Sequence, residues 1–135
     1  SSICATCHIA GEEGVRFGPP LSQIGSKLTK DALYVAILHP DAGISFGYEG
    51  YIFTMKDGSK QAGVIASETE DALELVMPGG VRKQFKKSEI SSRKAMENSM
   101  MPSNLQLTMS QQDLINLVEF LYAQKSAGAK EVASR

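Results

Sequence analysis

The sequence predicts a mainly helical domain with a small antiparallel β-sheet inserted in its middle. Apolar residues recur at helical spacing before residue 45 and again after residue 110. Between residues 46 and 95 the spacing changes to that of strands, and the turn signals Asp57-Gly58 and Pro78-Gly79-Gly80 divide this stretch. We therefore expect a single domain over residues 1–135, an inserted β segment over 46–95 and a flexible tail over 126–135.

The first helix is predicted to begin after Thr29, which can cap it, and to end before Pro40. Its apolar face carries Leu33, Ala36 and Ile37. About four strands follow, over residues 48–53, 62–66, 72–77 and 81–85.

The last helix is predicted to begin after Ser110, because Ser110 and Asp113 have the spacing of a capping box. Its apolar stripe consists of Leu114, Leu117, Val118 and Leu121.

The charge and the apolar pattern of the sequence argue against nucleic-acid binding and against a membrane span. The formal net charge of −1 does not give the basic surface that nucleic-acid binding usually needs, so no nucleic acid is expected. No apolar run has the length of a membrane span. The first cysteine follows Ser1-Ser2-Ile3 without a signal peptide, and we expect a mature or excised part of a longer exported protein.

The strongest chemical signal is Cys4-Ala5-Thr6-Cys7-His8, the pattern of covalent haem attachment. Two cysteines three positions apart on one helical turn can reach the two vinyl groups of a porphyrin. The histidine that follows then projects toward the iron. A zinc site would need two more ligands, and only His39 remains. A thioredoxin-like pair would follow a strand, and none is predicted there. The sequence therefore favours one covalently bound haem c, with Cys4 and Cys7 as attachment points and His8 as iron ligand.

Six methionines compete for the sixth position on the iron, and most are expected to be packing residues. Met101 is the predicted ligand, because it lies in a loop before the last helix and Pro102 restricts the backbone beside it. Met100 is the main alternative. His39 is a rival of a different class, although its place at a helix end also suits a favourable charge near the helix dipole.

These motifs, in this order, resemble those of class I cytochromes c. Gly18-Pro19-Pro20-Leu21 resembles their Gly-Pro-x-Leu loop, and Met101-Pro102 resembles their Met loop. The resemblance implies that the Pro19 carbonyl accepts a hydrogen bond from His8 and that Leu21 packs on the haem. It also implies the fold, a mainly α class I cytochrome c fold with three or more helices around the haem.

Nearly the whole chain is similar to a haem-binding domain found at the end of large exported proteins of planctomycetes and verrucomicrobia. The similarity is carried by residues 18–28, Gly47-Tyr48-Glu49, Asp57-Gly58, Ser91 to Lys94 and Ser99 to Pro102. In that family the domain often follows a sugar-dehydrogenase-like propeller or helical repeats. The resemblance implies a periplasmic or otherwise exported location, and a redox partner protein or a fused dehydrogenase domain. Class I cytochromes have a longer helix before the cysteines, and their pattern gives the β segment no role.

The expected function is electron transfer, because an iron with both axial positions filled by protein has no open site for a substrate. A peroxidase or nitrite-reducing enzyme would need an open position and a distal acid–base residue, for which His39 is the only candidate histidine. In a gas or redox sensor, Met101 would leave the iron on reduction. Arg93 and Arg16 are the candidates for pairing with the haem propionates.

Overall fold

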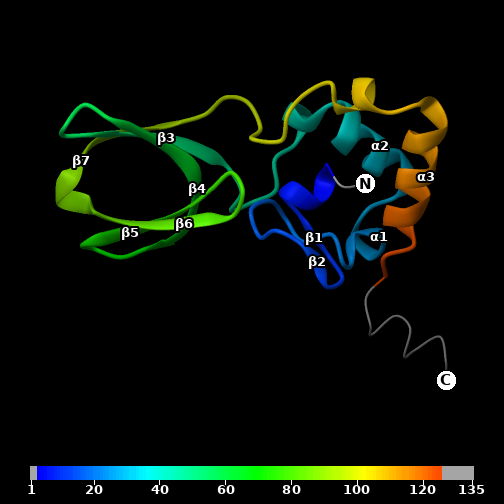
Figure 1. Ribbon diagram of the computed structural model, residues 1–135, viewed down its shortest axis with the longest axis horizontal. Coiled ribbons are helices and arrows are strands. Elements are labelled where there is room, and N and C mark those ends of the chain that lie inside the picture. The colour runs from blue at the N-terminus through cyan, green and yellow to red at the C-terminus, as the bar shows by residue number, and fades with distance from the viewer. Residues whose placement is uncertain (1–2, 126–135) are drawn as a thin grey trace.

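The computed structural model describes residues 3–125, and the predicted tail over 126–135 lies outside them. Within the described residues the chain forms three α-helices, seven strands and four 3₁₀ turns (Figure 1). The helices are α1 (Ile24–Lys27), α2 (Lys30–Leu38) and α3 (Gln111–Tyr122). The strands are β1 (Ile9–Ala10), β2 (Glu13–Gly14), β3 (Gly50–Met55), β4 (Lys60–Glu68), β5 (Ala72–Met77), β6 (Val81–Lys86) and β7 (Ile90–Ala95). The 3₁₀ turns are η1 (Cys4–Thr6), η2 (Pro40–Ala42), η3 (Lys87–Glu89) and η4 (Leu105–Thr108).

The prediction of a mainly α cytochrome c fold is wrong. The described chain consists largely of a five-stranded antiparallel sheet and a two-stranded sheet, with only three short helices. Two segments that were expected to be helical or irregular differ in the structure. The turn that carries the cysteines forms only the 3₁₀ turn η1. The glycines of residues 11–18 allow a small hairpin, β1–β2, where no strand was expected, with Gly11 and Gly14 at positive φ.

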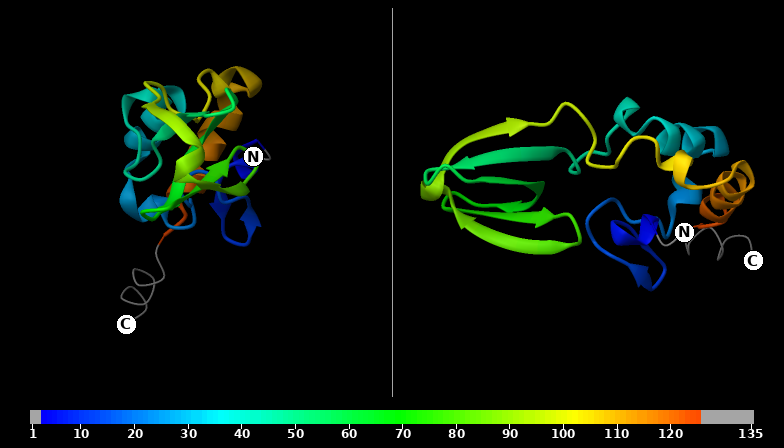
Figure 2. Two further views of the ribbon diagram at one scale, coloured as in Figure 1. Left: turned by 90° about the vertical axis from the view of Figure 1, so that its left-hand side faces the viewer. Right: turned by 45° about the horizontal axis from the view of Figure 1, so that its top comes forward.

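The larger sheet has the strand order β6-β5-β4-β3-β7, and every neighbouring pair is antiparallel. We name residues 50–95 the β unit. Figure 2 shows that this sheet is strongly curved. The turn η3 connects the edge strands β6 and β7 and returns the chain to β3. This return adds a fifth strand to the four that were expected.

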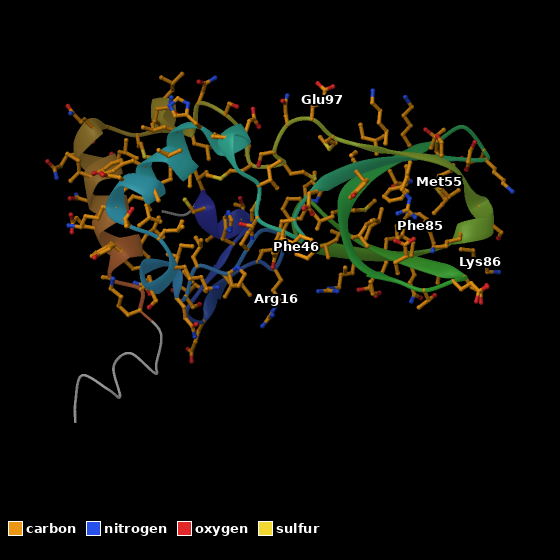
Figure 3. The ribbon with its side chains drawn as sticks, turned by 180° about the vertical axis from the view of Figure 1, so that it is seen from behind. Arg16, Phe46, Met55, Phe85, Lys86 and Glu97 are labelled. Carbon is orange, nitrogen blue, oxygen red and sulfur yellow. The ribbon has the colours of Figure 1, made fainter. Side chains whose placement is uncertain are left out.

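The concave face of the sheet holds the core of the β unit. Phe53, Met55, Leu73 and Leu75 are buried there, and Phe85 packs against them from β6. Met55 and Phe85 lie within the curve of the sheet in Figure 3. These residues alternate along their strands, as expected of a sheet with one buried face.

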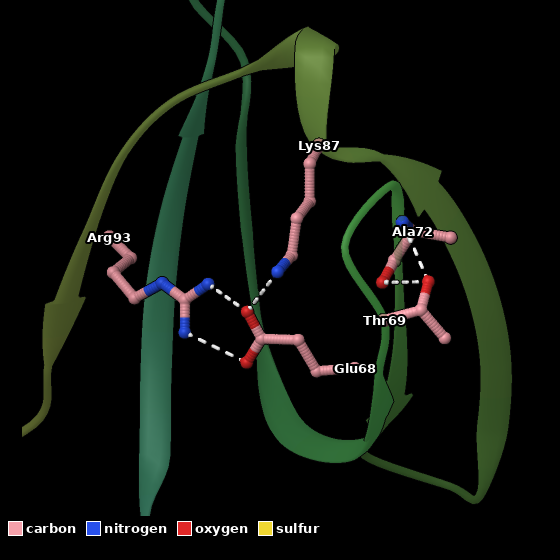
Figure 4. Close-up of polar contacts among 5 residues, drawn as sticks. All are labelled: Glu68, Thr69, Ala72, Lys87 and Arg93. Carbon is pink, nitrogen blue, oxygen red and sulfur yellow. Dashed lines mark hydrogen bonds and ion pairs between the residues drawn. The ribbon is translucent and has the colours of Figure 1, made fainter.

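One ion-pair network links the end of β4 to β7 and η3. The carboxylate of Glu68 accepts two hydrogen bonds from Arg93, at 2.6 and 3.2 Å, and pairs with Lys87 at 2.6 Å (Figure 4). The hydrogen bonds from Arg93 and Lys87 lower the pKa of Glu68 from 4.5 to about 2. The network therefore joins three segments of the β unit that are distant in sequence.

The first prediction concerns this network and its pH dependence. Because the folded pKa of Glu68 is lowered, its stabilising effect is complete above pH 4.5 and is lost as the pH falls toward about 2. We expect Glu68→Gln to melt at a lower temperature than the parent at pH 7, with a shallower loss of stability below pH 4.5. Thermal melts from pH 2 to pH 7 measure this. Exposed Glu70→Gln is the control, and equal melting curves for the Glu68 variant and the parent would contradict the prediction.

Residues 3–45 and 98–125 form what we name the helical lobe, and residues 46–49 and 96–97 connect it to the β unit. Helices α2 and α3 pack through the buried residues Leu33, Ile37, Leu117, Val118 and Leu121. Both predicted helix caps are confirmed. The Thr29 hydroxyl accepts a hydrogen bond from the amide of Ala32, and Ser110 and Asp113 form a reciprocal capping box. Within residues 3–125, no helix combines the length and apolar character that a membrane crossing requires.

The β unit packs directly against the helical lobe, and Figure 1 shows them side by side. Val64 and Val76, on the outer face of the sheet, are buried with Phe17 of the helical lobe. At the other contact, Gly50 leaves room for a methionine: a β-carbon placed there would lie 2.7 Å from Cγ of Met100. The β unit and the helical lobe are therefore joined by a packed apolar interface.

Candidate functional site

A largely apolar cavity of about 250 Å³ lies in the helical lobe, next to the β unit. All six residues that the sequence predicted for the site line this cavity: Cys4, Cys7, His8, Pro19, Leu21 and Met101. They come from η1 and the two residues after it, from the loop before α1 and from the loop before η4. A pocket with few convergent polar groups in an apolar wall is the usual form of a cofactor site.

The turn η1 places the two cysteines on the cavity wall. The amides of Cys7 and His8 both donate to the carbonyl of Cys4, at 3.1 and 2.9 Å, which closes a tight turn. The thiols of Cys4 and Cys7 are half-buried and not joined in a disulfide. The turn is 3₁₀ rather than the α-helical turn of the prediction, yet both sulphurs remain available at one wall.

The imidazole of His8 is oriented by a backbone carbonyl. Its Nδ1 lies 2.6 Å from the carbonyl oxygen of Pro19. Since a carbonyl can only accept, Nδ1 carries the proton and Nε2 keeps a free lone pair. A hydrogen bond of this kind fixes the tautomer and the ring orientation of a metal-binding histidine. The His8–Pro19 contact that the family resemblance implied is present in the structure.

Glycines bring the loop of residues 14–18 close to His8. A β-carbon on Gly18 would lie 2.5 Å from Cε1 of His8, and one on Gly14 would lie 1.9 Å from the His8 carbonyl oxygen. The amide of Gly18 also donates to the carbonyl of Cys7 at 2.6 Å. The imidazole is therefore held between the Pro19 carbonyl and the bare backbone of Gly18.

The loop of residues 98–102, which we name the Met loop, brings two methionines to the cavity. Both Met100 and Met101 line it. Met100 also packs against Val64 and Phe17, and its sulphur fills the space above Gly50. A third lining methionine, Met109, belongs to the packing between α2 and α3. Of these three side chains, Met101 is the one with no part in a core cluster of the described residues.

The alternative iron ligand and the two candidate partners of the haem propionates do not line the cavity. His39 ends α2 as an exposed residue and does not line the cavity. Arg93 belongs to the β unit, where it pairs with Glu68 and stacks on Phe53. Arg16 is exposed and is not one of the lining residues.

Sequence reasoning missed several residues of the wall. Tyr48 lines the cavity from the segment before β3, Val64 lines it from the outer face of the larger sheet, and Pro40 lines it from η2. The residue pattern could have assigned Val64 to a buried strand face. It could not have shown that this face is directed toward the cysteines, since that depends on how the sheet docks.

Comparison with known proteins adds no assignment: no family model matches the chain, and no significant match was found in a search of curated proteins. Over residues 3–125, histidine, cysteine and acidic side chains form no group of three or more that could hold a metal ion. The site is therefore defined by its own geometry, namely two thiols, one oriented imidazole and three methionine thioethers around an apolar cavity.

Proposed function

We propose that this chain binds one haem c covalently through Cys4 and Cys7 and transfers electrons. In this proposal His8 and Met101 would bind the haem iron. The observation that carries it is the convergence of both thiols, the oriented imidazole and the thioether on one apolar cavity. These are the donor types of a c-type haem site with histidine and methionine ligation.

The residues present fit the cofactor in chemistry. Two free thiols can form thioethers, the Nε2 lone pair of His8 can bind iron, and the Pro19 carbonyl holds the ring. Apolar side chains such as Leu21, Leu33 and Ile37 would exclude water from a bound porphyrin. When bound, haem supplies one-electron redox chemistry. A methionine ligand raises the reduction potential.

Electron transfer is favoured over catalysis by the content of the cavity wall. A peroxidase or nitrite-reducing site needs a distal group that can exchange protons. Among the described residues that line the cavity, His8 is the only histidine and none is a carboxylate. His39, the candidate for such a role, lies outside the cavity. The polar side chains that remain there, such as Ser45, Tyr48 and Ser99, carry hydroxyl groups.

The proposal also covers the location of the protein and its redox partner. Covalent attachment prevents loss of the cofactor, which suits a periplasmic or otherwise exported protein. The electron donor or acceptor would be a redox partner protein or a fused dehydrogenase domain. Reduction assays that pair the chain with separate candidate donors test this part.

The second prediction tests the proposal itself. After expression in a host that matures c-type cytochromes, we expect haem to stay with the chain through denaturation and extraction with acidic acetone. The reduced protein should give low-spin c-type absorption bands. The oxidised protein should add the weak far-red band of sulphur bound to iron. Cys7→Ser should leave at most one thioether and a low yield, whereas haem that passes into the acetone from the parent protein would refute covalent attachment.

A further inference from the structure

The Met loop is held by a hydrogen-bonded chain that starts outside the loop. The backbone amide of Ser99 donates to Oδ1 of Asp41 at 2.6 Å. The Ser99 hydroxyl in turn accepts a hydrogen bond from the amide of Met101 at 3.1 Å. Asp41 therefore acts on Met101 through one intervening residue, across 58 positions of sequence between Asp41 and Ser99.

The backbone that carries Asp41 is conformationally restricted. It lies in η2, whose first residue, Pro40, is buried and lines the cavity. The amide of Ala42 donates to the carbonyl of His39 at 2.9 Å, which closes the turn. Proline has a fixed φ, so the backbone that carries the carboxylate has little freedom.

The Met loop is also held on its N-terminal side, by the β unit. The amide of Met96 donates to the carbonyl of Gly50 at 2.9 Å, and Met100 occupies the space above Gly50. The backbone from these two attachments to Pro102 is short, so the hydrogen bonds at Ser99 restrict where Met101 can lie. A hydroxyl that accepts from an amide two residues later also favours a local turn.

We infer that Asp41 is a positioning residue for the iron ligand Met101, with Ser99 as the relay. This inference rests on the proposed function, because it assigns Met101 to the iron. The Asp41 carboxylate holds the Ser99 amide, and the Ser99 hydroxyl then holds the Met101 backbone. Removal of the carboxylate should let Met101 leave the iron more often, while both thioethers and His8 stay in place.

The expected change in carbon monoxide binding follows from the strength of the hydrogen bond between Asp41 and the Ser99 amide. Loss of a hydrogen bond to a charged acceptor changes a local equilibrium by roughly ten- to hundred-fold. Asp41 is exposed, so water screens part of this interaction. We expect Asp41→Ala to raise the rate at which the reduced protein binds carbon monoxide by about ten-fold. The far-red sulphur-to-iron band should weaken in the same variant.

The experiment compares four variants of the haem-loaded protein. Asp41→Ala removes the acceptor, Asp41→Asn keeps an amide oxygen that can accept, and Ser99→Ala removes the relay. Asp57→Ala is the matched control: Asp57 accepts from the amide and hydroxyl of Ser59 in the β3–β4 turn, and it does not line the cavity. The readouts are carbon monoxide binding, the far-red band and hydrogen exchange of the Ser99 and Met101 amides.

The expected pattern is a faster reaction with carbon monoxide in Asp41→Ala and Ser99→Ala, partial rescue in Asp41→Asn and parental behaviour in Asp57→Ala. Asp41→Ala should also exchange its Ser99 amide faster. If Asp41→Ala keeps the parental band and binding rate, the positioning role is refuted. The proposed function fails separately, through the parent protein alone: no covalent haem refutes it, and covalent haem without the sulphur band refutes the Met101 assignment on which this inference depends.

Discussion

Met101→Ala is expected to abolish the far-red sulphur-to-iron band and to open the sixth position of the iron. The side chain lines the cavity and takes no part in a core cluster of the described residues, so its removal should spare the packing of the lobe. The reduction potential should fall by an amount on the order of 100 mV, since axial ligands set haem potentials over about 0.8 V. Reduced variant protein should bind carbon monoxide rapidly. Spectroscopy, potentiometry and flash photolysis measure these three results.

Met100→Ala is the matched control for that experiment. Met100 fills the space above Gly50 and packs with Val64 and Phe17, so its loss should create a small void at the contact with the β unit. A buried methionine truncated to alanine costs roughly 2–5 kcal/mol, and less here because Met100 is only half-buried. Its spectrum should remain that of the parent. An exchange of behaviour between the two variants would make Met100 the ligand, and an unchanged spectrum in both would refute methionine ligation from this loop.

Gly18→Ala is expected to displace the proximal imidazole. A β-carbon at this position would lie 2.5 Å from Cε1 and 2.9 Å from Nδ1 of His8, which is too close for either group to stay in place. Movement of the ring breaks the 2.6 Å hydrogen bond to the Pro19 carbonyl and turns Nε2 away from its site. Overpacking of this kind costs about 1–3 kcal/mol. We expect a low yield of holoprotein, with the remaining fraction high-spin or ligated by another group.

Gly43→Ala separates this effect from a general sensitivity of the cavity to glycine substitution. Gly43 also lines the cavity, but a β-carbon there meets no atom within 4 Å and the residue does not require a positive φ. Its spectrum and melting temperature should match those of the parent. Low-spin parental bands in Gly18→Ala would show that the imidazole does not depend on the bare backbone beneath it.

The local parts of this molecule were predictable because their causes are local. Thr29 and Ser110 cap their helices with their own side chains, and the Asp57-Gly58 and Gly79-Gly80 turns need glycine at positive φ. The cysteine pair and His8 lie within five residues, so their proximity is fixed by chain connectivity. The grouping of the two cysteines with His8 was therefore predictable from sequence, although their role in haem binding stays a prediction.

The overall balance of strand and helix was not predictable in the same way. Strand β7, with the sequence Ile90-Ser-Ser-Arg-Lys-Ala, has no alternation of apolar residues, and almost all of it is exposed. It becomes a strand because η3 returns the chain to the open edge of β3, where backbone hydrogen bonds are available. Tertiary pairing, not local propensity, determined this strand, and with it the mainly β character of the described chain.

By itself, the sequence determined the group formed by the two cysteines and His8 and the local turns, which depend on residues close together in the chain. Only the tertiary structure decided which distant residues lie near that group. The Asp41 carboxylate meets Ser99 because η2 and the Met loop border the same cavity, and Val64 reaches the cavity because the sheet docks on its outer face. Such contacts depend on the packing of whole elements, and the free energy of that packing comes from the burial of apolar surface, which no short motif encodes.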